Sequence, residues 1–454
     1  MAEAPSNQPR AEGGLQAPTR HAIAWRDPAF WDRDALDAEL HRVYDICHGC
    51  RRCVSLCHAF PTLFDLVDAS PTMEVDGVAK SDYGKVVEQC YLCDLCYQTK
   101  CPYVPPHEWA IDFPHLMLRA KAQAFRRGEV PAQHERLTNT TGIGRLASIP
   151  VVAETVNAIN RSPTMRKVVR AVMGVHPDAR LPEYHHPTAR ARLKKAAAAH
   201  APQPAAVQAA GPTRGRVAVF VTCYGNYNMP QAVEDLVAVL RHNGIETRLI
   251  EREQCCGMPK LELGDLDSIE RYKKANLPLL AQAVRDGWDI TAPIPSCVLM
   301  FRQEIPLLFP EDGDVQALRG AIFDPFEYLM HRHRAGLLNT AFTQPLGKVA
   351  YHAPCHQRVQ NIGPKTRELL ALIPGTTLEA VERCSGHDGT YGVREATYER
   401  SMKIARPVVS KFKQAEPDHV SSDCPMAGEH LAHGMDPGRH SVHPISLLRR
   451  AYGI

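Results

Sequence analysis

Residues 215–223 read GRVAVFVTC, a short run of β-branched and aromatic residues that ends in a cysteine. A run that is apolar at nearly every position is typical of a parallel strand buried on both faces. A segment with helical spacing follows at 230–244, PQAVEDLVAVLRHNG, and a second strand-like segment, ETRLIE, at 246–251. This succession of strand, helix and strand predicts a small α/β unit built on a parallel sheet.

The same pattern occurs a second time. Residues 347–355 read GKVAYHAPC, with the length and the Gly, basic, Val, Ala start of residues 215–223. In both copies the chain continues to a cysteine-bearing turn and then to a cysteine within two residues of a proline. We expect two pseudo-symmetric halves, over about 216–340 and 346–454, that bring their turns to one site. The cysteines concerned are Cys223, Cys255, Cys256 and Cys297 in the first half and Cys355, Cys384 and Cys424 in the second.

The residues before 216 have a different character. Apolar residues at helical spacing in 31–50 and 113–125, with few strand signals, predict a mostly α-helical domain over 21–175. The Ala/Pro-rich stretch 176–215 buries little surface and is expected to be a linker, with a helix near 190–199. The polar residues 1–20 are expected to be a disordered tail.

Eight cysteines fall in two short runs within the helical domain. The first, CHGCRRCVSLC at 47–57, has cysteine spacings of two, two and three residues. The second, CYLCDLCYQTKC at 90–101, has spacings of two, two and four residues, and a proline follows it. Three thiolates at this spacing wrap around one 4Fe–4S cluster, while the fourth cysteine of each run ligates the other cluster. The domain is therefore expected to be ferredoxin-like, with two clusters: Cys47, Cys50, Cys53 and Cys101 hold the first, and Cys90, Cys93, Cys96 and Cys57 hold the second.

Zinc is the alternative metal for these eight thiols. A zinc site takes four ligands, usually as two separated pairs. The third closely spaced cysteine of each run has no role in such a paired geometry, so the spacing favours clusters. A zinc-organised interaction protein remains an alternative function.

The two ferredoxin-type runs, the linker and the duplicated Cys…Cys-Cys-Gly…Cys module resemble iron–sulfur subunits related to heterodisulfide reductase. That family includes the C subunit of anaerobic glycerol-3-phosphate dehydrogenase, and the resemblance covers nearly the whole chain after residue 20. In the family, each module ends in C-x2-C, but Met300 and Ala427 stand at the last cysteine here, and Ser385 replaces the second cysteine of the pair. The resemblance implies one further cluster at Cys223, Cys255, Cys256 and Cys297. It implies weaker ligands at Cys355, Cys384 and Cys424, which leave one iron open or need Ser385 or His356 as a further ligand.

Composition and charge narrow the functional class. The net charge of +3 over 454 residues gives no concentrated basic character, so nucleic acid is not an expected partner. Fifteen cysteines, without an apolar leader in residues 1–20, favour metal binding in the cytoplasm over a disulfide framework. We expect a cytoplasmic protein, with peripheral docking on the inner face of the cytoplasmic membrane left open.

These features predict an iron–sulfur oxidoreductase component that transfers electrons. Because the sequence contains no G-x-G-x-x-G motif or P-loop, flavin and nucleotide are expected on a partner. Electrons would come from a dehydrogenase, a flavoprotein by this argument, and pass to a quinone or another acceptor. The enzymatic alternative is a catalytic C-terminal cluster that reduces a disulfide-type substrate. No individual catalytic residue is assigned by the sequence.

Overall fold

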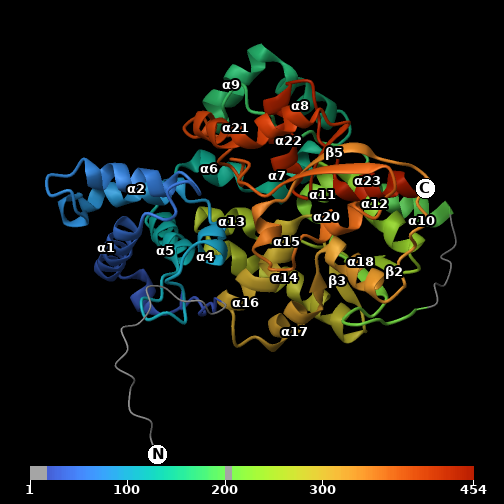
Figure 1. The fold of residues 1–454 in the computed structure, drawn as a ribbon, viewed down its shortest axis with the longest axis horizontal. Coiled ribbons are helices and arrows are strands. Elements are labelled where there is room, and N and C mark those ends of the chain that lie inside the picture. The colour runs from blue at the N-terminus through green and yellow to red at the C-terminus, as the bar shows by residue number, and fades with distance from the viewer. Residues whose placement is uncertain (1–17, 200–206) are drawn as a thin grey trace, which may run out of the picture. The chain divides into compact units, whose positions relative to one another are not determined.

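The computed structural model describes residues 18–199 and 207–454 (Figure 1). The chain divides into two compact units: unit 1 extends to Ala120, and unit 2 is Lys121–Ile454. The expected tail falls mostly on residues outside the described ones, and so do residues 200–206 of the expected linker. Among the described residues, no helix combines the length and the apolar character needed to cross a membrane.

Unit 1 is helical. Between Pro18 and Ala120 every element is an α-helix or a short 3-10 turn, which agrees with the mostly α character expected from the sequence. Asp32 caps the first helix by accepting a hydrogen bond from the backbone N–H of Ala35. Apolar side chains such as Leu40, Val43 and Met117 are almost fully buried between the helices. The α-helices are α1 (Arg33–Cys50), α2 (Ala59–Asp68), α3 (Tyr83–Gln89), α4 (Leu95–Thr99) and the first half of α5 (Phe113–Arg126).

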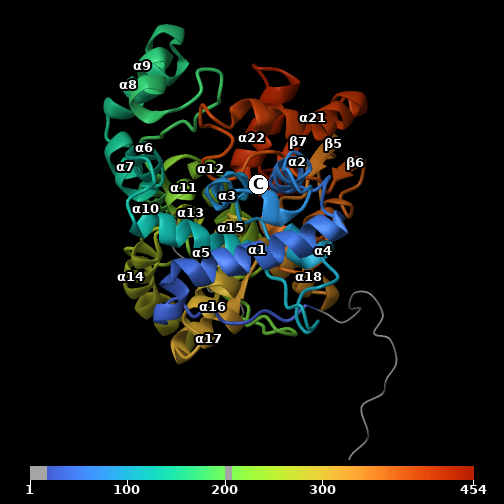
Figure 2. The same cartoon turned by 90° about the vertical axis from the view of Figure 1, so that its left-hand side faces the viewer.

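Unit 2 opens with four helices that follow one another along one side of it (Figure 2). They are α6 (Ala132–Leu137), α7 (Thr140–Ala147), α8 (Val152–Arg161) and α9 (Pro163–Met173). We expected these segments in the first domain, whereas the compact units divide at Ala120. A further helix, α10 (Ala189–Ala199), lies in the expected linker, and its Ala189 is buried in a core of unit 2. The domain bounds 21–175 and 216–454 stay a prediction.

Two parallel sheets form the centre of unit 2, as the repeated strand pattern predicted. The first has the order β2-β1-β3-β4 and the second the order β6-β5-β7. The strand that opens each repeat is therefore flanked by its second and third strands in the same order. The strands are β1 (Arg216–Val219), β2 (Glu246–Leu249), β3 (Asp289–Thr291), β4 (Ile322–Phe323), β5 (Gly347–His352), β6 (Thr376–Val381) and β7 (His419–Ser422).

Helices connect and cover these strands. In the first repeat they are α11 (Cys223–Tyr227), α12 (Pro230–His242), α13 (Met258–Leu263), α14 (Leu266–Arg285), α15 (Pro295–Leu299), a π-helical turn (Met300–Glu304), α16 (Ile305–Leu308), α17 (Gly313–Ala321) and α18 (Pro325–Arg334). In the second they are α19 (Cys355–Arg358), α20 (Lys365–Leu370), α21 (Tyr398–Ala415), α22 (Pro425–Met435) and α23 (Pro444–Tyr452).

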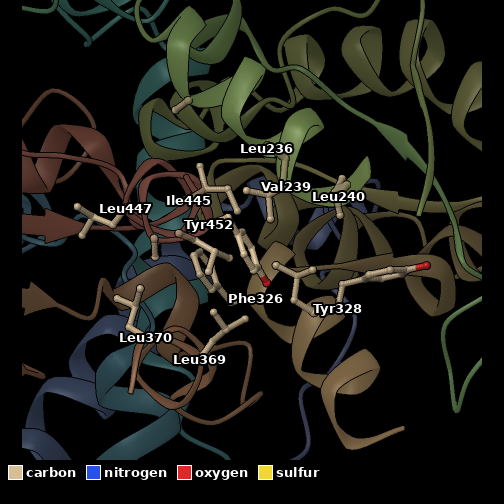
Figure 3. Close-up of a cluster of buried hydrophobic side chains, with 14 of the residues drawn as sticks. Leu236, Val239, Leu240, Phe326, Tyr328, Leu369, Leu370, Ile445, Leu447 and Tyr452 are labelled. Atoms are coloured by element: carbon tan, nitrogen blue, oxygen red, sulfur yellow. The ribbon is translucent and has the colours of Figure 1, made fainter. Parts of the chain in front are cut away.

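The two repeats share one hydrophobic core. Figure 3 shows Leu236 and Leu240 of α12, from the first repeat, close to Ile445 and Tyr452 of α23, from the second. All four side chains are at most 3% exposed. Burying one such side chain stabilises the fold by roughly 1.5–3 kcal/mol, so this core holds the repeats together as one body.

Candidate iron–sulfur and cavity sites

The four thiols expected to hold the first cluster lie close enough to interact electrostatically. Burial raises the pKa of Cys47 well above its ordinary value, and the negative charges of Cys101, Cys53 and Cys50 raise it further. Cys101 comes from the second cysteine run. The structure thus brings the last cysteine of that run to the first three of the other.

The four thiols expected to hold the second cluster also lie close enough to interact electrostatically. Burial raises the pKa of Cys96 well above its ordinary value, followed by the charges of Cys93, Cys90 and Cys57, and then of Cys53. Cys57 comes from the first run, so both runs exchange their final cysteine. Thiols that raise one another's pKa are costly to ionise without a cation, and coordination to iron removes that cost.

The backbone around these cysteines takes up an uncommon conformation. Arg51, after Cys50, has φ of 47°, and Leu92 and Asp94, on either side of Cys93, have φ of 56° and 61°. Residues other than glycine rarely adopt this left-handed region, and they cluster at functional sites when they do. Alternation of right- and left-handed residues also turns backbone N–H groups toward a common centre, as in many iron–sulfur sites.

Arg20 stabilises the second cysteine run, and sequence reasoning missed it by placing it in the tail. Its guanidinium forms ion pairs with Asp94 and Asp112, including a contact of 3.0 Å from Nη2 to Asp94 Oδ1. The side chains of Arg20 and Asp94 are 7% and 4% exposed, so the pair is buried. No local sequence pattern signals a contact between residues that are 74 positions apart.

In unit 2, the cysteines of both repeats line a single cavity of about 1290 Å³. They follow the carboxyl ends of parallel strands, where ligand sites of open α/β sheets are usually found. Cys223 begins α11 after β1, and Cys355 begins α19 after β5, at equivalent positions. The predicted convergence of the two sets of turns is therefore present. The other cysteines on the cavity wall are Cys255, Cys256, Cys297, Cys384 and Cys424.

The four thiols of the first repeat form a continuous series. Cys223 Sγ lies 3.9 Å from Cys255 Sγ. Hydrogen bonds from Cys223 and Cys256 lower the pKa of Cys255 well below its ordinary value. The bonds of Cys256 to Cys255 and Cys297, together with burial, raise the pKa of Cys256. Four adjacent sulfur atoms are a donor set that suits an iron–sulfur centre.

Thr140, at the start of α7, also contacts this thiol series. Its Oγ1 lies 3.3 Å from Cys223 Sγ and 3.5 Å from Cys255 Sγ. No sequence motif indicated this residue, because it precedes Cys223 by 83 positions. The buried Met300, at the position of the missing cysteine, begins the π-helical turn instead.

The second repeat presents fewer sulfur donors. Burial raises the pKa of Cys424 to about 11, and Cys384 Sγ accepts a hydrogen bond from the N–H of Gly386 at 3.4 Å. The Ser385 hydroxyl is bonded to the backbone of His387, at 3.4 Å to its carbonyl oxygen and 3.3 Å from its N–H. Ala427, at the other missing cysteine, is buried in α22. The Ser385 hydroxyl therefore has backbone partners. The ring of His356 lies against Ser296 and Asp388.

Comparison with known proteins identifies the repeated module. A family model described as the cysteine-rich domain CCG matches residues 217–302 and 349–431, the two repeats. The chain is 29% identical over 301 residues to the C subunit of the anaerobic glycerol-3-phosphate dehydrogenase of Escherichia coli K12, covering 66% of this chain and 72% of that protein. It is 25% identical to the B subunit of the fumarate reductase (CoM/CoB) of Methanothermobacter marburgensis over 51% of this chain and 45% of that one.

A third relative, an iron–sulfur protein of Methanococcus maripaludis, is 24% identical over 51% of this chain and 46% of its own length. These findings confirm the resemblance drawn from the cysteine spacing. The chain carries the CCG cysteine-rich domain twice and is homologous to the C subunit of anaerobic glycerol-3-phosphate dehydrogenase and to heterodisulfide-reductase-like iron–sulfur proteins.

Proposed function

We propose that this chain is an iron–sulfur electron-transfer protein with two 4Fe–4S clusters in unit 1 and a third cluster in the first repeat of unit 2. The observation that carries the proposal is the grouping of the eight N-terminal thiols into two sets of four, each completed by a cysteine of the other run. Cys53 also interacts with Cys96 of the second set. Two clusters held this way would lie close together, which is what rapid electron transfer requires.

The proposed third cluster uses Cys223, Cys255, Cys256 and Cys297. Its support is the continuous series of thiols and the match of the CCG domain to this segment. The three thiols of the second repeat, Cys355, Cys384 and Cys424, were predicted as weaker cluster ligands. They line the same cavity, but they supply one thiolate fewer than a cubic cluster needs.

We infer that electrons arrive from a dehydrogenase partner that holds a flavin and leave to a quinone or another acceptor. The names of two relatives, which are subunits of a dehydrogenase and of a reductase, support a redox partner. Apolar side chains exposed on α7–α9 support peripheral docking on the cytoplasmic membrane: Val151 is 74% exposed and Val168 and Val172 are each 51% exposed. Amphipathic helices that carry basic residues on their polar face bind at membrane interfaces, and α9 contains Lys167 and Arg170.

Anaerobic purification of the full chain tests this proposal. Three cubic clusters correspond to about twelve iron atoms and as many labile sulfides per chain. A Cys256→Ser variant should lose about four of each, while Met300→Leu, a buried apolar change three residues after Cys297, should lose none. An electron paramagnetic resonance spectrum of the reduced protein should show interacting clusters. A colourless protein with zinc and no labile sulfide would exclude the proposal and favour the zinc-organised alternative.

A second candidate function is catalysis at the C-terminal cavity. Its volume of about 1290 Å³ is larger than the roughly 300–1,000 Å³ of typical small-molecule sites, so it has room for a substrate. Thiols of both repeats face this space, so a disulfide-type substrate could reach them. Turnover of disulfide substrates by the lone chain, with reduced viologen as donor, would favour the enzyme. Reduction of the clusters without turnover favours the electron-transfer protein.

A further inference from the structure

Three metal-ligating side chains of the second repeat converge on the cavity wall. One donor atom each of Cys355, His356 and Asp388 lies within 4.8 Å of the other two. Cys355 and His356 begin α19 after β5, and Asp388 stands in the turn after β6. The side chains of His356 and Asp388 are 5% and 6% exposed. All three residues line the large cavity.

The distances suit one metal ion. In a tetrahedral site with metal–sulfur bonds of about 2.3 Å and metal–nitrogen or –oxygen bonds of about 2.0–2.2 Å, the donor atoms are about 3.3–3.8 Å apart. His356 Nε2 lies 4.0 Å from Asp388 Oδ2. Side-chain shifts of a few tenths of an ångström would therefore bring these two donors to bonding geometry.

The second nitrogen of His356 has the partner that metal-ligating histidines usually have. Its Nδ1 lies 2.8 Å from the Ser296 hydroxyl, which leaves Nε2 directed at Asp388. Asp388 in turn shares a side-chain hydrogen bond with Glu262. Outer hydrogen bonds of this kind fix the orientation and tautomer of the ligands, and their loss typically weakens metal binding 10–100-fold.

A neighbouring histidine indicates that this part of the cavity accommodates a polar occupant. His387 is 9% exposed and lines the cavity next to Asp388. Neither of its ring nitrogens forms a hydrogen bond within the described part of the chain. Buried polar atoms are normally paired, so an unpaired ring facing a cavity is an independent pointer to a ligand there.

We propose that the second repeat holds a single divalent metal ion, zinc by its donor set, on Cys355, His356 and Asp388. Thiolate, imidazole and carboxylate together suit zinc, and three protein ligands leave its fourth position open, as in catalytic sites. That position faces the cavity shared with the first repeat, where it takes an anionic group of a ligand. The two repeats then carry different centres, although they share one fold. This inference does not depend on the clusters of unit 1.

Metal analysis and zinc-edge X-ray absorption of the anaerobically purified full chain test the site. We expect one zinc per chain, with one sulfur neighbour at about 2.3 Å and nitrogen or oxygen neighbours at about 2.0–2.2 Å. Asp388→Asn and His356→Gln should hold zinc at least about tenfold more weakly against a chelator, with iron and labile sulfide unchanged. His440→Gln, a change of an exposed histidine on the same cavity, should retain zinc as the unaltered chain does.

Four results overturn the proposal: full iron and sulfide without zinc, a zinc shell of four sulfurs, zinc that both variants retain, or loss of iron and sulfide in a variant that still folds. The last would make the site part of a cluster. The absorption spectrum needs no variant, so misfolding of a variant leaves the test intact. A zinc shell of four sulfurs together with missing labile sulfide would contradict the proposed clusters as well. Absent zinc with intact clusters contradicts this site alone.

Discussion

Thr140 Oγ1 lies 3.3 Å from Cys223 Sγ, although 83 residues separate the two in sequence. The hydroxyl reaches Cys255 as well, at 3.5 Å. Helix α7 therefore contributes a polar group to a thiol series otherwise built by the first repeat. A hydroxyl that donates to ligand sulfurs stabilises the reduced, more negative cluster, and such bonds help to set reduction potentials.

Thr140→Val should make the potential of the proposed third cluster more negative, by roughly tens of millivolts, because the bond to a charged sulfur is lost. Thr141→Val is the matched control, since the Thr141 hydroxyl is buried without a hydrogen-bond partner among the described residues. Redox titration, monitored by electron paramagnetic resonance, measures the cluster potential in both variants. Equal potentials in the two variants would contradict the assigned role of Thr140.

The exchange of final cysteines between the two runs can be tested with double variants. Cys50→Ser with Cys101→Ser alters one proposed cluster twice, so the chain should lose about four iron atoms. Cys50→Ser with Cys57→Ser alters both clusters, so the loss should be about eight. Iron and sulfide counts separate the two cases. If the first double variant instead lost about eight iron atoms and the second about four, each run would keep its own fourth cysteine.

Arg20→Ala should destabilise unit 1 by about 3 kcal/mol, because it removes the guanidinium that pairs with the buried Asp94 and the partly buried Asp112. Burial alone would raise the pKa of Asp112, yet the charges of His115 and Arg20 lower it well below its usual range. The control is Arg33→Ala, whose 62% exposed side chain lies 3.9 Å from Asp37 and should cost under about 1 kcal/mol. Denaturant unfolding, monitored by the loss of cluster absorbance, compares the Arg20→Ala and Arg33→Ala variants. Similar unfolding midpoints in the two variants would contradict the role of Arg20.

The low pKa of buried His443 should make unit 2 less stable in mild acid than at neutral pH. Its Nε2 lies 3.1 Å from the Pro293 carbonyl oxygen and its Nδ1 accepts the Ile445 N–H, so both nitrogens are satisfied in the neutral form. Burial lowers the pKa of His443 to about 4, against about 6.5 in the unfolded chain. Between these values the unfolded state binds the extra proton, so stability is lost as the pH falls from about 6.5 to 4, by at most about 3 kcal/mol.

His443→Asn tests this dependence, because asparagine can also cap α23 but does not titrate. Its unfolding midpoint in urea should fall less between pH 7 and pH 5 than that of the unaltered chain. His440→Asn, at a side chain that is 68% exposed, should keep the original slope. A slope unchanged by His443→Asn would contradict the prediction.

Local signals in the sequence sufficed for the α/β repeats but not for everything around them. The buried strand at 216–219 and the amphipathic helix at 230–242 formed where their apolar periods predicted. Arg20, Thr140 and Asp388 had no such signal, because their contacts join segments far apart in the chain. The grouping of α6–α9 with unit 2 likewise depends on tertiary packing rather than on composition.

The position of α23 has a consequence for biosynthesis. Ile445 and Tyr452 of α23 complete the core against α12 of the first repeat. A nascent chain that still lacks α23 therefore cannot close that core, even after the thiols of the first repeat have left the ribosome. Metal delivery to a closed unit 2 therefore follows the synthesis of α23, whereas all eight cysteines of unit 1 lie within the first 101 residues.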